Sequence, residues 1–181
     1  SMSDYHVGPD PRVTLFPEDD GASGDIIRLA IVAAIGGVLA GLLGGLFRWF
    51  LNQAFELRID LLAWADENPA ARWIIPVAIA AIAVAAARLI VRFVPEASGS
   101  GVQHVEANMR GDDEVSPLRI IPAKFFGGLL AIGSGLALGR EGPTVQIGAT
   151  IGNQAARLAG LSQHDRRTLT ASLAGAGLGV A

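Results

Sequence analysis

The sequence contains no cysteine, which excludes a disulfide framework and any metal site with thiolate ligands. Charged residues are scarce at 17% of the chain, whereas 51% of the residues are hydrophobic. The mean hydropathy of +0.43 is too high for an ordinary soluble domain. The first 25 residues contain a single arginine and a crowd of acids: Asp4, Asp10, Glu18, Asp19, Asp20 and Asp25. Because nucleic acid binds basic surfaces, this distribution argues against nucleic acid as a partner.

The chain contains long apolar runs. The first run covers residues 26–47 and is interrupted once, by Arg28. Its 22 residues match the helix of about 20 residues that crosses the hydrocarbon core of a bilayer. Asp25 is placed to cap this helix, and Arg48 with Trp49 is placed to end it at an interface. We therefore expect a membrane-spanning helix, with a buried helix of a large soluble protein as the alternative.

The second apolar run covers residues 74–91. Residues 50–72 carry both signs of charge, and they predict a helical extension that ends in a turn at residues 67–69. Trp73 marks an interface at the start of the second run, and Arg88 near its end can snorkel to the opposite interface. The basic residues of the loops slightly favour a cytoplasmic amino terminus.

The remaining apolar segments are too short to cross a bilayer as straight helices. Short hydrophobic segments interrupted by glycine or proline are typical of transporters, in which discontinuous helices point their N-termini at the substrate. We predict an all-α integral membrane protein of tilted and broken helices, with residues 1–24 as a polar cytoplasmic tail and residues 25–181 as the membrane domain. The chain ends inside an apolar segment, so we infer that it is part of a longer protein. The short segments are residues 125–138, 142–156 and 168–181.

Small residues recur at every fourth position of two apolar segments. The first set is Gly37, Gly41 and Gly45, and the second set is Gly127, Ala131, Gly135 and Gly139. Small side chains let helix backbones approach closely in a membrane. Each set therefore predicts a face for tight helix packing.

Two glycine-flanked loops contain the candidate anion-binding residues of the chain. Residues 99–101 read Gly-Ser-Gly, and residues 139–143 read Gly-Arg-Glu-Gly-Pro before an uncharged helix. Glycines allow a ligand to approach the backbone, and the free N–H groups of a helix N-terminus attract anions. The carboxylate of Glu141 can fill such an anion site itself. Once neutralised or displaced, it would leave the site to a small external anion.

Simpler interpretations of these residues stay open. Ser100 is also suited to be a helix N-cap, and Pro143 suits the first position of a helix, which is compatible with function. Glu141 in turn can be a buried structural carboxylate paired with Arg140.

Three segments together resemble the CLC family of chloride channels and transporters. They are Gly-Ser-Gly at residues 99–101, Pro-Ala-Lys-Phe-Phe-Gly-Gly at residues 122–128 and Gly-Arg-Glu-Gly-Pro-Thr-Val-Gln at residues 139–146. They stand in the family's order and at its separation, and the resemblance covers roughly residues 25–181. It implies most of the first of two inverted repeats, in a homodimer whose subunits each have their own pore.

The resemblance implies roles for the matching residues. Ser100 would donate its hydroxyl to a central anion site. Glu141 would be the gate, which blocks an outer anion site when ionised and moves out when protonated. Lys124 would add positive potential without binding the anion directly. The implied anion-binding set is Ser100, Gly99, Gly101, Arg140 and Gly142.

The resemblance also implies transport of chloride and similar small anions, by a channel or by a chloride/proton exchanger. Chloride, protons and the lipid bilayer would be the partners, with no cofactor and no enzymatic activity, in a multi-pass protein of the bacterial inner membrane. Gln103 and His104 stand where the family usually has proline and glutamate. The family's second proton-transfer glutamate lies outside this chain, so the sequence does not choose between channel and exchanger.

Two other classes of function compete with this one. A nucleotide-binding enzyme could use the glycines of residues 133–135 or 175–177, but it needs a strand before them. The preceding segments are rich in glycine and alanine and lack a β-branched run, which disfavours that class. The other alternative is a non-transporting helical membrane fragment or assembly unit, because the second half is absent.

Overall fold

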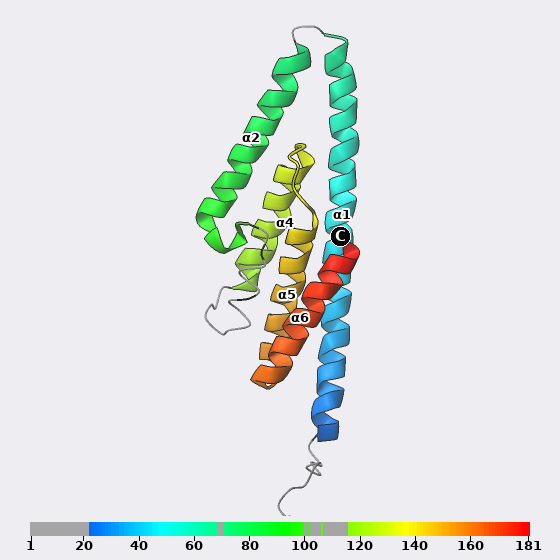
Figure 1. Cartoon of the computed structure of the whole chain (residues 1–181), viewed down its shortest axis with the longest axis vertical. Helices are drawn as coiled ribbons and strands as arrows, with labels where there is room; N and C mark the ends of the chain where they lie inside the picture. Colours follow the sequence, from blue (N-terminus) through cyan, green and yellow to red (C-terminus); the bar gives the residue numbers. More distant parts are fainter. Residues whose placement is uncertain (1–21, 69–70, 100, 102–105, 107–115) are drawn as a thin grey trace, which may run out of the picture.

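The structure, a computed structural model, describes residues 22–68, 71–99, 101, 106 and 116–181. Within these residues every regular element is a helix (Figure 1). The all-α prediction is confirmed over the described part of the chain. The elements are α1 Ala22–Asp66, α2 Ala71–Phe93, the 3-10 helix η1 Pro95–Ala97, α4 Pro117–Gly133, α5 Glu141–Leu158 and α6 Gln163–Val180.

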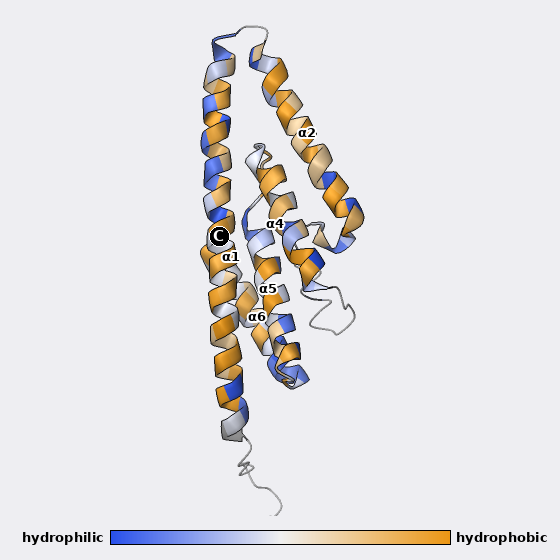
Figure 2. Ribbon diagram, turned by 180° about the vertical axis from the view of Figure 1, so that it is seen from behind, coloured by the Kyte–Doolittle hydropathy of each residue, from blue (hydrophilic) through white to orange (hydrophobic). Residues whose placement is uncertain are grey.

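The longest element, α1, has 45 residues and therefore measures about 68 Å at 1.5 Å per residue. The predicted span and its predicted extension form one continuous helix. Figure 2 shows that its first half is mostly apolar and that charged residues enter in its second half. The predicted cap is wrong, because α1 begins at Ala22 and Asp25 lies inside its first turn. There the carboxylate still interacts favourably with the positive end of the helix dipole.

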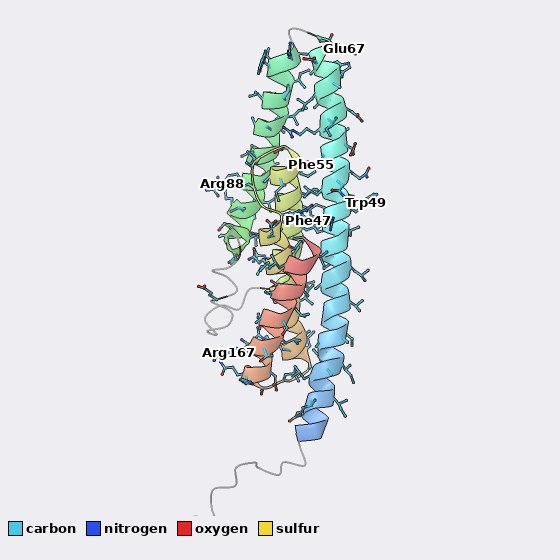
Figure 3. The ribbon with its side chains drawn as sticks, turned by 45° about the vertical axis from the view of Figure 1, so that its right-hand side comes forward. Phe47, Trp49, Phe55, Glu67, Arg88 and Arg167 are labelled. Carbon is cyan, nitrogen blue, oxygen red and sulfur yellow. The ribbon has the colours of Figure 1, made fainter. Side chains whose placement is uncertain are left out.

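A turn that begins at Glu67, labelled at the tip of the hairpin in Figure 3, separates α1 from α2 as predicted. The backbone carbonyl of Asn68 accepts a hydrogen bond of 2.8 Å from the N–H of Ala71. An exposed ion pair of 2.8 Å joins Arg72 to Asp66 across the turn. After this turn α2 runs back beside the second half of α1 (Figure 1).

The most apolar stretches of α1 and α2 lie on the surface of the described structure. Only 11% of the residues in the α1 stretch and 6% of those in the α2 stretch are buried. Large side chains such as Ile35, Leu42 and Ile82 are more than half exposed. Soluble proteins rarely expose apolar patches of this size, and the core helix of a soluble protein would be mostly buried. Both helices are long and apolar enough to cross a membrane.

The core forms where α4, α5 and α6 pack around the middle of α1. Phe47 of α1 is fully buried and meets the ring of Phe125 of α4 edge-on, with 5.4 Å between the ring centroids. Figure 3 shows Phe47 directed toward the neighbouring helices and Trp49 directed away from them. The other buried members of this cluster are Ala40, Leu51, Ile132, Ile147, Ile151, Ala156, Leu169 and Leu173.

The glycine face of α1 differs from the predicted one. Gly36 and Gly44 face α6, where an added Cβ would meet side-chain atoms at 2.5 and 2.9 Å. Of the predicted set, Gly41 and Gly45 have no atom within 4 Å of that position, and Gly37 makes only an ordinary contact at 3.9 Å. Glycine does mediate the packing of α1, but on a face shifted by one residue.

The second predicted glycine ladder is wrong beyond Ala131, because α4 ends at Gly133. Gly135 and Gly139 lie in the connection to α5, where Gly135 has a φ of 100°. The close contacts of α4 are made instead by Gly128 and Gly133. An added Cβ would lie 3.1 Å from α5 at Gly128 and 2.9 Å from α1 at Gly133.

Each of the three short apolar segments contains a helix, which begins earlier than the apolar run. The start of α4 is Pro117. The start of α6 is set by Ser162, whose hydroxyl oxygen accepts a 3.1 Å hydrogen bond from the backbone N–H of Asp165. Since α5 begins at Glu141, Pro143 is its third residue and not its first.

Glycine also brings the antiparallel helices α5 and α6 into backbone contact. Gly148 lies against the carbonyl oxygen of Leu173, and Gly177 lies against the carbonyl oxygen of Thr144. A Cβ at either glycine would overlap these backbone atoms. The pair therefore fixes the position of the first turn of α5, where Glu141 lies.

Candidate functional site

The segment that follows α2 turns through two glycines in the left-handed region. Gly99 has a φ of 67° and Gly101 has a φ of 82°. Side chains with a Cβ rarely adopt this conformation, so the glycines are required by the path of the backbone. The 3-10 turn η1 precedes these glycines.

Lys124 attaches this segment to α4. Its ammonium group donates hydrogen bonds to the carbonyl oxygens of Ala97, at 3.0 Å, and Gly99, at 2.6 Å. The residue is only 5% exposed. A buried ammonium group is costly unless it is hydrogen-bonded, and two carbonyls meet part of that need. Lys124 therefore places a positive charge beside the loop while it holds the loop's backbone.

Gln146 of α5 holds the same segment from the other side. Its side chain is fully buried, and Nε2 donates a 2.8 Å hydrogen bond to the carbonyl oxygen of Glu96. A Cβ added to Gly101 would lie 2.7 Å from the Cβ of Gln146. The Gly101 position is thus restricted by its neighbour as well as by its φ. The described residues offer no hydrogen-bond partner to Oε1 of Gln146.

Glu141 is the first residue of α5, and its side chain is exposed. Among the described residues, its carboxylate accepts no hydrogen bond and makes no ion pair, so the predicted alternative of a pair with Arg140 is not formed. The first N–H groups of a helix have no partner within that helix. Pro143 has no N–H, which leaves those of Glu141, Gly142 and Thr144 as the donors of the first turn.

An open cavity of about 980 Å³ connects these parts. The wall from α2 includes Val84 and Arg88, and the opposite walls come from the Gly99 loop, α4 and the start of α5. The charged side chains of this lining are Arg88, Lys124 and Glu141. Most other lining residues are small or apolar. Hydrogen-bond donors at the wall of an apolar cavity can replace the lost hydration of a small anion.

Four predicted site residues meet in this cavity: Gly99, Lys124, Glu141 and Gly142. Gly101 packs against Gln146 and is not part of the lining, and neither is Arg140, which is half-buried beside Glu141. The remaining predictions concern Ser100, Gln103 and His104, which lie outside the described part of the chain.

The sequence prediction missed Gln146 and Arg88. The signal for Gln146 was an amide near the start of α5, four residues before the next polar side chain, since a buried amide needs a hydrogen-bond partner. Its partner, a backbone carbonyl 50 residues away, has no sequence signature. Arg88 was interpreted as a snorkelling residue, because the sequence does not show which face of an apolar helix meets a cavity.

Comparisons with known proteins agree with this architecture. A family model described as voltage gated chloride channel matches residues 82–181. The H(+)/Cl(-) exchange transporter ClcA of Vibrio vulnificus (strain YJ016) is 40% identical over 157 residues, which are 86% of this chain and 34% of that protein. ClcA of Salmonella arizonae is 34% identical over 157 residues, 86% of this chain and 33% of that protein. This chain thus spans about a third of the length of the curated relatives it matches.

A solved structure shares the fold. The crystal structure of a slow cyanobacterial Cl-/H+ antiporter superposes with a TM-score of 0.79 and 32% sequence identity. The match covers 84% of this chain and 36% of the antiporter chain. Transporters of this family are integral membrane proteins, in agreement with the two exposed apolar helices described above. Since the family model matches more than half of the residues, the chain belongs to the voltage gated chloride channel, or CLC, family.

Proposed function

We propose that the full-length protein transports chloride across a bacterial inner membrane as a chloride/proton exchanger, with Glu141 as its protonatable gate. The observation that carries this proposal is the cavity in which Lys124 and the Gly99 loop face Glu141 and the N-terminus of α5. Positive charge and free N–H groups favour a small anion there. The carboxylate of Glu141 competes with that anion for the same donors.

The names of the relatives favour exchange over a simple channel. The ClcA proteins of Vibrio and Salmonella are named H(+)/Cl(-) exchange transporters, and the solved structure is named a Cl-/H+ antiporter. An exchanger needs a group that carries a proton and meets the anion at one site. Among the described residues that line the cavity, Glu141 is the acid, so it is our candidate for that group.

The binding roles of the neighbouring residues are proposed from the family resemblance. We propose that Gly142 and its neighbours supply backbone N–H groups to an outer anion position, and that Ser100 supplies its hydroxyl to a central one. Gly99 and Gly101, on either side of Ser100, allow the backbone conformation that this needs. Lys124 then acts through its charge and through the carbonyls that it holds.

Flux from liposomes that contain the full-length protein tests the transport itself. A chloride gradient is imposed with potassium and valinomycin fixing the membrane potential, and chloride efflux and proton uptake are recorded together. The proposal predicts chloride efflux accompanied by proton movement against a proton gradient. Efflux without proton movement would make the protein a channel, and no efflux would leave a non-transporting membrane assembly.

We also propose that the full-length protein is a homodimer, as the family resemblance implies. Light scattering in detergent would give the protein mass of two subunits. The mass of one subunit would contradict this part of the proposal without touching the flux prediction.

A further inference from the structure

Arg88 lies within the apolar helix α2, which is one of the two candidate membrane spans. It is the sixth residue from the end of α2, and Figure 3 shows it well below the turn marked by Glu67. A charged side chain within a membrane span is costly, and such residues generally face a water-filled cavity, a bundle interior or a partner charge. Its position in α2 therefore calls for a function.

Arg88 lines the same cavity as Glu141. Three other residues of α2 line the same wall, namely Val84, Ala87 and Val91. The facing walls contain Lys124 and Glu141. Two cations thus face one carboxylate in a mostly apolar lining. Even with Glu141 ionised, the charged side chains of the lining sum to a positive charge.

The two cations of the lining differ in how they are bound. Lys124 donates to two backbone carbonyls and is nearly buried. The guanidinium of Arg88 is exposed and makes no hydrogen bond or ion pair with the described residues. Arg88 is therefore the cation whose donors remain free for an anion within the described part of the cavity.

We propose that Arg88 is an anion-attracting residue of the transport pathway, which raises the local concentration of chloride in front of the Glu141 site. This inference rests on the proposed function, since it assigns a further residue to the same cavity. A clustered charge on low-dielectric walls concentrates counter-ions by focusing the field. The effect is expected on the apparent affinity for chloride more than on the maximal rate.

The test compares Arg88→Gln, Arg88→Lys and Arg92→Gln in the full-length protein, in liposomes, over a series of chloride concentrations. Arg92 is the matched control, because it lies one turn further along α2 and does not line the cavity. Arg88→Gln should raise the half-saturating chloride concentration roughly three- to tenfold, the scale expected when one unit charge is removed from a partly screened site. Arg88→Lys and Arg92→Gln should stay near the wild type.

An unchanged half-saturating concentration in Arg88→Gln, or an equal shift in Arg92→Gln, would overturn the inference and leave Arg88 as a snorkelling residue. Absence of chloride flux in the wild type would overturn the proposed function, and this inference with it. A second measurement needs no variant: added gluconate salt should weaken the apparent chloride affinity of the wild type by screening. An affinity that is independent of ionic strength would contradict the proposal.

Discussion

Individual side chains hold the loop after α2 against two different helices. Lys124 reaches it from α4, and Gln146 reaches it from α5. All three bonds end on backbone carbonyls, those of Glu96, Ala97 and Gly99, so they hold the backbone of the loop and not its side chains. Gly99 and Gly101 supply the backbone conformation, and these contacts hold it. The proposed anion site thus depends on residues that need not touch the anion.

Replacing Lys124 tests this role. Lys124→Met keeps most of the side-chain volume and removes two charge-assisted hydrogen bonds, each worth about 1.5–3 kcal/mol. We expect weaker chloride binding, by roughly tenfold or more, and a lower melting temperature of the full-length protein in detergent. Calorimetric titration with chloride measures the first and a thermal melt the second. Lys124→Arg, which keeps the charge, should have a chloride affinity between those of the wild type and Lys124→Met. Wild-type affinity in Lys124→Met would contradict the assignment.

Ser100 belongs to the same loop, and its predicted role concerns selectivity. Ser100→Pro removes the hydroxyl and a backbone N–H. By the family resemblance, we expect the preference of the full-length protein to shift from chloride toward nitrate. The measurement is the ratio of nitrate to chloride flux in liposomes, with Ser134→Ala, outside the lining of this cavity, as the control. A ratio equal to that of the wild type would count against Ser100 as an anion ligand.

Residue-level prediction succeeded where the backbone itself imposes a residue type. Gly99 and Gly101 stand at positive φ, and Glu141 begins α5, while the gating role of Glu141 stays a prediction. It failed for contacts to backbone carbonyls, since the acceptor of Gln146 has no side-chain identity to be recognised. The cavity position of Arg88 was equally hidden, because it depends on how α2 rotates against α4.

At the scale of elements, close glycine contacts determine how α5 and α6 cross. Gly148 and Gly177 each contact a carbonyl oxygen of the other helix. A Cβ added to Gly152 would lie 2.7 Å from the carbonyl oxygen of Leu169. Such contacts leave no room for a methyl group. They hold the first turn of α5, and with it Glu141, in a fixed place relative to α6.

A pair of variants in one helix tests this packing. Gly177→Ala forces a methyl group into the carbonyl of Thr144, whereas Gly175→Ala has no atom within 4 Å of its new Cβ. Overpacking of this kind costs about 1–3 kcal/mol. We therefore expect Gly177→Ala to lower the melting temperature of the full-length protein by several degrees in a detergent thermal melt, and Gly175→Ala to change it little. Equal melting temperatures would refute the contact.

The sequence predicted the existence of the helices better than their faces. Residues 26–47 are apolar on every side, so their pattern has no polar face to mark the outside, and the predicted glycine ladder fell one residue from the real one. The starts of α4 and α6 were missed because charged residues, Arg119 and Lys124 in α4 and Asp165 to Arg167 in α6, separate them from the apolar runs. Caps such as Ser162 were the better signal for these boundaries.

At the scale of the whole molecule, two exposed apolar helices flank a small packed core. The hairpin of α1 and α2 projects beyond the packed helices α4, α5 and α6 (Figure 1). The chain corresponds to about a third of its curated relatives, and the cavity of about 980 Å³ is open. The all-α class and the family were predictable from apolar runs and three short motifs. The cavity was not, since it is formed by α2, α4 and α5 together.

The central claim is that Glu141 competes with chloride for the N-terminus of α5 and carries the transported proton. The most direct measurement is chloride efflux and proton uptake by liposomes with full-length protein, wild type against Glu141→Gln, over a series of pH values. In the wild type, lower pH protonates the carboxylate and should raise efflux. Glu141→Gln should give efflux independent of pH and no proton uptake. A variant that keeps wild-type pH dependence and proton coupling would contradict the claim and make Glu141 a structural acid.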